Sequence, residues 1–142
     1  MMTSKEYLRQ AYRLDQRINS DIEEVGRLRS MASSVSSPSL GERVQTSHNG
    51  DAPFVRSIEK IIELEHKIDQ EIDLYVNLKD QIRTVIAKVE DPNEQLVLRY
   101  RYVHNYTWEQ IGDRLYADRT TVYRWHSNAL RHVTLPKDPI II

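Results

Sequence analysis

The sequence predicts an all-α protein in which a long helical, coiled-coil-like hairpin is followed by a C-terminal three-helix helix-turn-helix module. Three observations support this fold class. Apolar residues recur at steps of three and four over long stretches. Glycine and proline are scarce (4 and 5 of 142 residues), and charged residues make up 29% of the chain. We expect residues 1–92 to form the two long helices, residues 93–135 the module and residues 136–142 a tail.

The first long helix is predicted from an apolar stripe between Tyr7 and Met31, because the apolar residues share one face and the charged residues occupy the rest. The apolar positions are Tyr7, Ala11, Leu14, Ile18, Ile22, Val25, Leu28 and Met31. Thr3 or Ser4 is the expected N-cap, with an incomplete capping box because Tyr7 stands three residues after Ser4. Gly26 costs about 1 kcal/mol relative to Ala, so the helix can bend or end there.

A flexible linker is expected at about residues 33–52. This stretch is rich in serine and other polar residues, so almost nothing in it can be buried to offset the entropy of ordering it. The linker is long enough for a second helix to return antiparallel to the first. The natural product is a helical hairpin.

The second helix is predicted from about Pro53 to Glu90. Its apolar stripe consists of Ile58, Ile61, Ile68, Ile72, Tyr75, Ile82, Val85 and Val89, and it is widened by Ile62, Leu64 and Leu78. Glu65 and Lys79 fall in the seam, where a strict heptad has apolar residues, and such intrusions set register or partner choice at a cost in stability. Two stripes this narrow make a thin core, so we expect a homodimer or a higher homo-oligomer.

Composition excludes most classes of enzyme and cofactor site. The chain has no cysteine, which excludes disulfides, thiolate zinc sites and cysteine nucleophiles and fits a reducing cytoplasm. Its glycines are too far apart to form a Gly-rich phosphate loop. Glu63 and His66 form a Glu-x-x-His unit, but a di-iron bundle needs two such units and two further glutamates. We therefore expect no enzyme, with no catalytic residue, metal or cofactor.

A membrane location is not expected. No apolar run approaches the roughly 18–20 residues that span a bilayer. No apolar stretch follows the charges at the N-terminus, so a secretory signal is not expected either. We expect a cytoplasmic protein.

The formal net charge of −1 conceals an uneven distribution. Residues 1–92 carry 13 Lys/Arg and 16 Asp/Glu, a balance of −3, whereas residues 93–142 carry 7 and 5, a balance of +2. Seven of the eleven aromatic residues lie between Tyr100 and Trp125. The C-terminal part is therefore built differently, and it can carry a local basic face although the total charge is near zero.

Three capping signals divide the C-terminal module into helices. Asp91-Pro92-Asn93-Glu94 combines an N-cap, a first-turn proline and a capping-box glutamate. Thr107-Trp108-Glu109-Gln110 is a second capping box, and its helix extends to about Leu115. Asp118 caps the last helix, which extends to about His132. A short helix, a turn of about three residues and a longer helix thus follow a supporting helix, which is the helix-turn-helix arrangement.

The last helix carries the side chains that we expect to meet double-stranded DNA. Val122, Trp125, Ala129 and Leu130 face inward, and Trp108, Trp125 and Tyr100 help to build the small core. The outward positions have no acidic residue, Arg can read guanine bidentately, and Thr can contact a base. The base-reading candidates are Arg119, Thr120, Thr121 and Arg124, and the phosphate candidates are Arg114, Tyr123, Ser127 and Arg131. His126 and His132 can add charge at mildly acidic pH or serve in packing.

Two runs of this module resemble a known family. The runs are Thr107-Trp108-Glu109-Gln110-Ile111-Gly112-Asp113-Arg114-Leu115 and Asp118-Arg119-Thr120-Thr121-Val122-Tyr123-Arg124-Trp125, followed by Ala129-Leu130. They look like sigma-70 region 4 and, more closely, like the small phage-encoded regulators of the ArpU/RinA type. Tyr116-Ala117 stands where most members have a Gly-containing turn.

The resemblance implies a phage or prophage transcription regulator in the cytoplasm of a bacterial host, often an activator of late genes. Such a protein binds promoter DNA through the last helix, with RNA polymerase as a further candidate partner. The resemblance covers about 40 residues, and for residues 1–92 it extends only to the general layout.

Two other functions remain open. A DNA-packaging recognition subunit of the small-terminase kind also joins a helix-turn-helix to a helical hairpin, although its DNA-binding part usually comes first. A ring of eight or more subunits would favour packaging, and a dimer would favour regulation. A protein-binding coiled-coil adaptor would show no salt-dependent binding to DNA.

The tail ends in three isoleucines, Ile140, Ile141 and Ile142. We expect them to fold back onto the hairpin, and docking on a partner such as polymerase is the alternative. Deleting them separates the two hypotheses, because lost thermal stability indicates packing whereas lost activation alone indicates docking.

Overall fold

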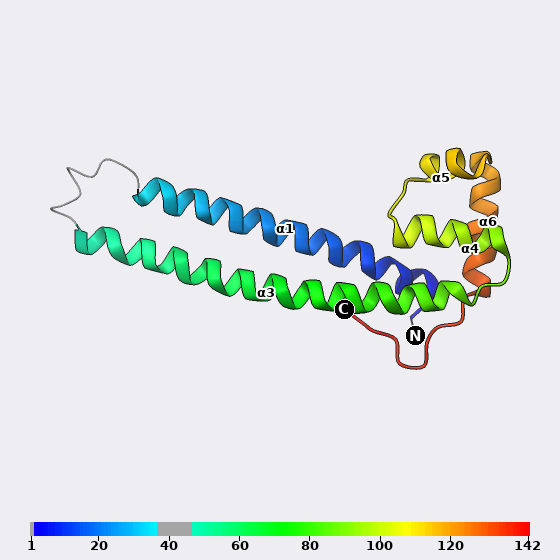
Figure 1. Ribbon diagram of the computed structural model, residues 1–142, viewed down its shortest axis with the longest axis horizontal. Helices are drawn as coiled ribbons and strands as arrows, with labels where there is room; N and C mark the ends of the chain where they lie inside the picture. The colour runs from blue at the N-terminus through cyan, green and yellow to red at the C-terminus, as the bar shows by residue number, and fades with distance from the viewer. Residues whose placement is uncertain (1, 37–46) are drawn as a thin grey trace. The chain divides into compact units, whose positions relative to one another are not determined.

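The computed structural model describes residues 2–36 and 47–142, with side chains placed for residues 2–33 and 53–142. Throughout these residues the regular elements are helices and no strand is present, so the predicted all-α class is confirmed (Figure 1). The elements are α1 (Ser4–Ser36), α3 (Ser47–Ala87), α4 (Pro92–Leu98), the π-helix η2 (Arg99–Val103), α5 (Trp108–Leu115) and α6 (Arg119–His132).

The chain forms two compact units. The terminal unit contains Met1–Asp15 and Leu74–Ile142, and the central unit contains Gln16–Asp73. The boundary predicted at Pro92 does not separate these units, because the start of α1 and the end of α3 belong with the C-terminal helices. The helices α4, α5 and α6 therefore share one unit with parts of both long helices.

The first long helix begins with a complete capping box, not the incomplete one predicted at Ser4. Thr3 is the N-cap, because the Glu6 N–H donates to Thr3 Oγ1 (3.1 Å) and the Thr3 N–H donates to Glu6 Oε2 (3.0 Å). The helix also runs through Gly26 without ending. The cost of one glycine is small compared with the packing that holds the two flanking halves.

The second long helix is displaced from its predicted bounds. It begins at Ser47 rather than Pro53 and ends at Ala87 rather than Glu90. Of the flexible linker predicted at about residues 33–52, residues 37–46 lie outside the described residues, and residues 33–36 and 47–52 are helical instead. Both long helices extend into the ends of that range.

In the central unit, α1 and α3 run antiparallel and share a heptad seam. The Arg29–Glu65 ion pair and the Lys67 Nζ to Asp21 Oδ2 contact (3.3 Å) fix the opposite directions of the two helices. The buried apolar residues of the seam are Ile18, Val25 and Ala32 from α1 and Ile61 and Ile68 from α3.

The polar residues of this seam differ from the prediction. Glu71 is buried on α3, whereas the predicted Glu65 is partly exposed and pairs with Arg29. Five apolar residues predicted for the stripes are instead exposed, namely Ile22, Met31, Ile58, Ile62 and Ile72. On α3, two neighbouring heptad rows each mix apolar residues with a glutamate (Glu65 in one and Glu71 in the other), and only one of these rows can face the partner helix.

In the terminal unit, the two long helices carry the largest buried side chains. The Tyr7 hydroxyl donates to Gln81 Oε1 at 2.6 Å, which joins the start of α1 to the end of α3. Lys79, predicted in the seam, is half-buried and donates to the Val103 carbonyl at the end of η2. The fully buried side chains of the long helices are Tyr7, Leu8, Leu14, Leu78, Ile82 and Ile86.

The tail lies against the long helices, as expected (Figure 1). The Ile140 N–H donates to Gln81 Oε1 (2.9 Å), and Gln10 Nε2 donates to the Ile140 carbonyl (2.8 Å). The Ile142 N–H donates to Gln10 Oε1 at 3.1 Å. Two glutamines, one from α1 and one from α3, therefore hold the backbone of the tail.

The C-terminal helices close around a small core. Val97 from α4, Ile111 from α5 and Val122 from α6 are fully buried. The partly buried side chains packed against them are Tyr100, Tyr106, Trp108, Leu115, Ala117 and Trp125. The predicted core roles of Trp108, Trp125 and Tyr100 agree with this packing.

The predicted helix starts in this region are confirmed by their caps. Asp91 Oδ1 accepts from the backbone N–H groups of Asn93 and Glu94, the second and third residues of α4. Thr107 and Gln110 form the reciprocal capping box of α5. Asp118 Oδ1 accepts from the Thr121 N–H at 2.8 Å and starts α6. Local capping chemistry thus sets where each helix begins.

Candidate nucleic-acid interface

A turn of three residues joins α5 to α6. Tyr116 adopts the left-handed conformation (φ 52°, ψ 46°), and the Ala117 N–H donates to the Gly112 carbonyl at 3.0 Å. A Cβ atom at position 112 would lie 2.8 Å from the Ala117 carbonyl oxygen. The close approach of the turn to α5 therefore requires glycine at 112.

The structure places most of the predicted DNA-binding side chains on the solvent side of α6. Thr121 is the exception, because it is half-buried. The exposed ones are Arg119, Thr120, Tyr123, Arg124, Ser127 and Arg131 on α6, and Arg114 on α5. Arg114 lies over the Tyr106 ring, 4.4 Å from its centroid, so contacts within the module hold it apart from the others. The inward positions predicted on α6 are buried or half-buried.

The charges along α6 suit a polyanion. No Asp or Glu lies within the helix. Asp118, at its N-terminus, accepts the Thr121 backbone hydrogen bond, which holds the Asp118 pKa below its usual value. That carboxylate is occupied as a cap and complements the helix dipole. Near the other end, Arg131 Nη2 donates to Asn128 Oδ1 at 2.9 Å, which orders a basic side chain on the exposed face.

An aromatic ladder, which the sequence analysis did not identify, links η2, α5 and α6. We define it as Arg101, Trp108, Tyr123 and Arg119. The Arg101 guanidinium lies 4.4 Å from the Trp108 ring centroid, the Trp108 and Tyr123 rings meet edge-to-face at 5.0 Å, and Arg119 lies 5.8 Å from the Tyr123 ring. An arginine lies at each end of the ladder, and the two packed rings between the arginines connect them rigidly.

His126 is a packing residue. It is buried on α6, stacks edge-to-face on Trp108 at 4.6 Å, and shares a 2.7 Å hydrogen bond with the Tyr102 hydroxyl. Burial, aided by the nearby charges of Lys5 and Arg101, lowers the His126 pKa from 6.5 to about 4. It therefore adds no charge at mildly acidic pH. The spacing of four from Val122 and three to Ala129 already indicated the inward face.

His132 has a specific partner. Its Nδ1 atom lies 2.5 Å from Glu94 Oε1, and the Glu94 side chain is buried at the start of α4. Glu94 therefore does not complete the capping box predicted at Asp91. It connects α4 to the end of α6 instead.

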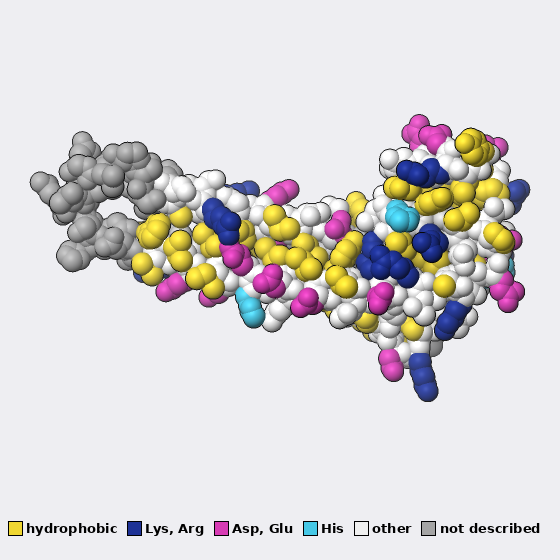
Figure 2. All heavy atoms as spheres, viewed as in Figure 1, with side chains coloured by type: hydrophobic (Ala, Val, Ile, Leu, Met, Phe, Trp, Pro, Cys, Tyr) yellow, Lys and Arg dark blue, Asp and Glu magenta, His cyan; other side chains and the backbone are white. Residues whose placement is uncertain are grey.

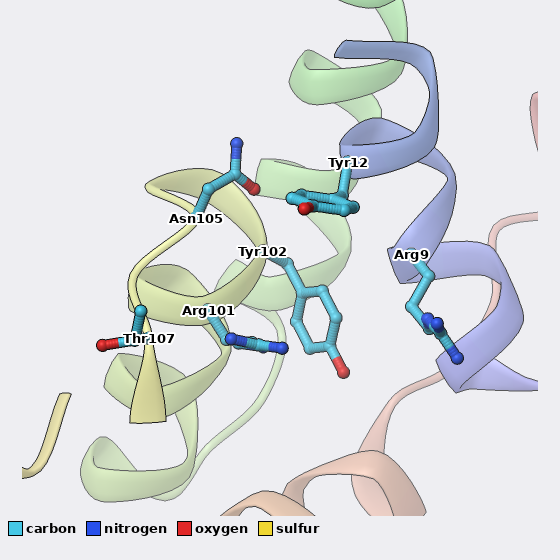
Figure 3. A pocket seen from close by; sticks show the side chains of 6 residues that line it. All are labelled: Arg9, Tyr12, Arg101, Tyr102, Asn105 and Thr107. Atoms are coloured by element: carbon cyan, nitrogen blue, oxygen red, sulfur yellow. The ribbon is translucent and has the colours of Figure 1, made fainter. Parts of the chain in front are cut away.

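A cavity of about 250 Å³ opens where α1 meets η2 and the start of α5. Its lining residues are Arg9, Tyr12, Arg101, Tyr102, Asn105 and Thr107 (Figure 3). In the close-up, Arg9 and Arg101 flank the Tyr102 ring, and Asn105 lies at the other end beside Tyr12. Asn105 has a positive φ of 58°, and its buried Oδ1 has no hydrogen-bond partner within the described structure.

The surface view shows where charged and apolar side chains lie on the molecule. Lys and Arg side chains gather over the terminal unit, and apolar side chains are exposed along the long helices (Figure 2). Within the described ranges, no group of three or more His, Asp or Glu side chains could hold a metal ion. No helix described here is long and apolar enough to cross a membrane.

Comparison with known proteins identifies a family for this chain. A model of the family described as "Protein of unknown function (DUF1492)" matches residues 35–134, which include all of α3 to α6. No curated protein and no solved structure matches the chain.

Proposed function

The chain belongs to the family described as protein of unknown function (DUF1492), and from its C-terminal helices we propose that it binds double-stranded DNA and regulates transcription. The observation that carries the proposal is the solvent face of α6. Behind a three-residue turn, this helix presents exposed Arg, Thr and Ser side chains and no acidic residue. An α-helix fits the major groove, where Arg and Thr can read base edges.

The proposal assigns different roles along this face. Arg119, Thr120 and Arg124 are the base-reading residues, and half-buried Thr121 has the least reach. The exposed residues proposed to contact phosphates are Tyr123, Ser127, Arg131 and Arg114. Phosphate contacts position the protein and base contacts give specificity, so the two groups should respond differently to mutation.

A single module binds weakly, because its charge balance is small and affinity follows the number of phosphates neutralised. We therefore propose a homodimer or higher homo-oligomer that presents two or more copies of α6. Exposed apolar side chains on the central unit support this assembly. They include Ile22, Met31, Val55, Ile58, Ile62 and Ile72.

The regulatory role rests on the resemblance to sigma-70 region 4 and to phage-encoded regulators of the ArpU/RinA type. We propose a phage or prophage regulator, typically of late genes, that acts in the host cytoplasm with RNA polymerase as a candidate partner. The long helices carry no aromatic and basic cluster of the kind that promoter melting requires. A complete sigma factor is therefore not proposed.

The first experiment selects DNA fragments of the source genome that bind the full chain, and footprints them. Arg124→Ala should relax specificity at one base position, at a cost of about 1–3 kcal/mol. Arg27→Ala is the matched control, since Arg27 is an exposed arginine of the central unit paired with Glu24. Unchanged binding of Arg124→Ala would place the reading face elsewhere, and no salt-dependent binding by the wild type would favour a protein-binding adaptor.

A further inference from the structure

The cavity beside η2 is lined by basic and aromatic side chains, and none of its lining residues is acidic. Arg9 comes from α1 and Arg101 from η2, so two elements far apart in the sequence supply its guanidinium groups. Lys5 acts electrostatically on His126 together with Arg101, which adds a third positive charge to this side of the unit. Together these charges favour an anion.

The two arginines differ in how they are held. Arg101 Nη1 donates to the Tyr106 carbonyl at 3.0 Å, and its guanidinium lies on Trp108, so its position is fixed. Arg9 is exposed and forms no hydrogen bond or ion pair with the described residues. One guanidinium is thus preorganised and the other is available to close on a ligand. Guanidinium groups bind phosphate oxygens through paired N–H donors.

The cavity continues the proposed DNA-binding face. Arg101 lines the cavity and is also the first member of the aromatic ladder, which ends at Arg119 on the first turn of α6. Thr107, the N-cap of α5, also lines the cavity, so the positive end of that helix dipole lies beside it. Helix N-termini of this kind bind phosphate.

We propose that this cavity holds a backbone phosphate of the bound duplex, clamped between Arg9 and Arg101 while α6 occupies the adjacent major groove. The inference rests on the proposed function and extends it, because it gives the first long helix a direct role in binding DNA. The clamp reads no base. It adds affinity and fixes orientation.

The test is the salt dependence of DNA binding by the full chain. Arg9→Ala should lower the slope of log K against log [salt] by about 0.9, which corresponds to roughly an eightfold loss of affinity at 0.1 M salt. The loss should be equal for selected and random DNA, because a phosphate contact is independent of sequence. Arg9→Lys should retain most of the slope. Because Arg9 is exposed, we expect both Arg9 variants to keep the fold of the wild type. Circular dichroism melting checks this.

Lys88→Ala is the matched control. Lys88 is also an exposed cation of the terminal unit, but it lines a different hollow together with Glu90, Asp91 and Glu94. Acidic neighbours make that surface unfavourable for DNA, so removing this cation should leave the salt slope unchanged.

The outcomes separate this inference from the proposed function. If the wild type binds no DNA, both fail. If the wild type binds DNA and Arg9→Ala has the same salt slope, only the clamp is overturned. Inorganic phosphate, followed by 31P NMR, is the second probe. Arg9-dependent binding of free phosphate with an unchanged DNA slope would assign the cavity to a free phosphate compound and overturn the DNA clamp.

Discussion

The Tyr102 hydroxyl oxygen and the His126 Nε2 atom lie 2.7 Å apart in the interior of the terminal unit. Their rings stack at 5.7 Å, and both side chains are buried. This pair joins η2 to the inner face of α6, directly behind the outward residues proposed to read DNA. The position of the proposed reading helix therefore depends on one buried polar contact as well as on apolar packing.

Tyr102→Phe should destabilise the protein by about 1–2 kcal/mol, because it leaves the buried His126 nitrogen without its partner. Urea unfolding followed by circular dichroism measures the change. Tyr12→Phe is the control, since Tyr12 is a tyrosine of the same unit that is 53% exposed. Equal effects of the two substitutions would show that the buried hydrogen bond contributes nothing specific.

The same pair predicts a pH dependence. Burial lowers the His126 pKa from 6.5 to about 4, so between these values the unfolded chain binds a proton that the folded chain does not. The stability associated with neutral His126 is therefore complete above about pH 6.5 and is lost as the pH falls toward 4. After discounting for solvent screening, we expect a loss of about 2 kcal/mol.

His126→Gln tests the assignment, because glutamine fills part of the site and does not titrate. Urea midpoints measured from pH 7 to pH 4 should fall less steeply for this variant than for the wild type. Parallel curves would mean that other groups cause the acid destabilisation and that His126 is not the responsible residue.

Gly26 and Gly112, which lie within α1 and α5, predict opposite effects of the same substitution. A Cβ at Gly112 would lie 2.8 Å from the Ala117 carbonyl oxygen, whereas a Cβ at Gly26 would meet nothing within 4 Å. Gly112→Ala should destabilise by about 1–3 kcal/mol through strain in the turn. Gly26→Ala should stabilise by up to about 1 kcal/mol, since alanine is the better helix former. Thermal melts of both variants measure this, and a stabilising Gly112→Ala would contradict the described turn.

Local chemistry made the C-terminal helices predictable. Asp91, Thr107 and Asp118 each cap a helix within four residues of their own position, so no distant contact is needed to recognise them. The outward residues of α6 could be predicted from helical spacing alone. The aromatic ladder and the cavity could not be predicted in this way, because Arg9 and Arg101 come together only when α1 packs beside η2.

The long helices were harder to predict for a physical reason. Two neighbouring heptad rows of α3 each mix apolar and acidic residues, Ile58, Glu65 and Ile72 in one and Leu64 and Glu71 in the other, so the pattern could not show which row faces α1. The prediction placed Glu65 in the seam, where the structure has Glu71. The tail is a similar case, because the Gln10–Ile140 contact joins residues from opposite ends of the chain and only the general fold-back was expected.

Glu71 itself leads to the last prediction. It faces Asp21 across the seam, and neither of its buried carboxylate oxygens has a hydrogen-bond donor in the described structure, whereas Asp21 Oδ2 has Lys67 Nζ at 3.3 Å. Burial and the neighbouring Asp21 raise the Glu71 pKa, with Lys67 and Arg17 opposing this. The hydrogen bond with Glu71, together with Lys67 and Arg17, lowers the Asp21 pKa. A proton on Glu71 therefore satisfies both groups, since its O–H can donate to the Asp21 carboxylate.

Because the folded-state pKa of Glu71 is raised, its contribution to stability is present at low pH and is lost as the pH rises through that pKa. Glu71→Gln should remove this loss and stabilise the protein by about 1 kcal/mol at pH 7, since a neutral amide can donate to Asp21 without like-charge repulsion. At pH 4 the variant and the wild type should differ little.

Glu63→Gln is the control on the same helix, because Glu63 is exposed and pairs only with Lys60 at the surface. Urea unfolding of the wild type and both variants at pH 4 and pH 7 measures the differences in stability. Destabilisation by Glu71→Gln at pH 7 would show that the ionised side chain is held by Lys67 and Arg17, and that no proton is shared across the seam.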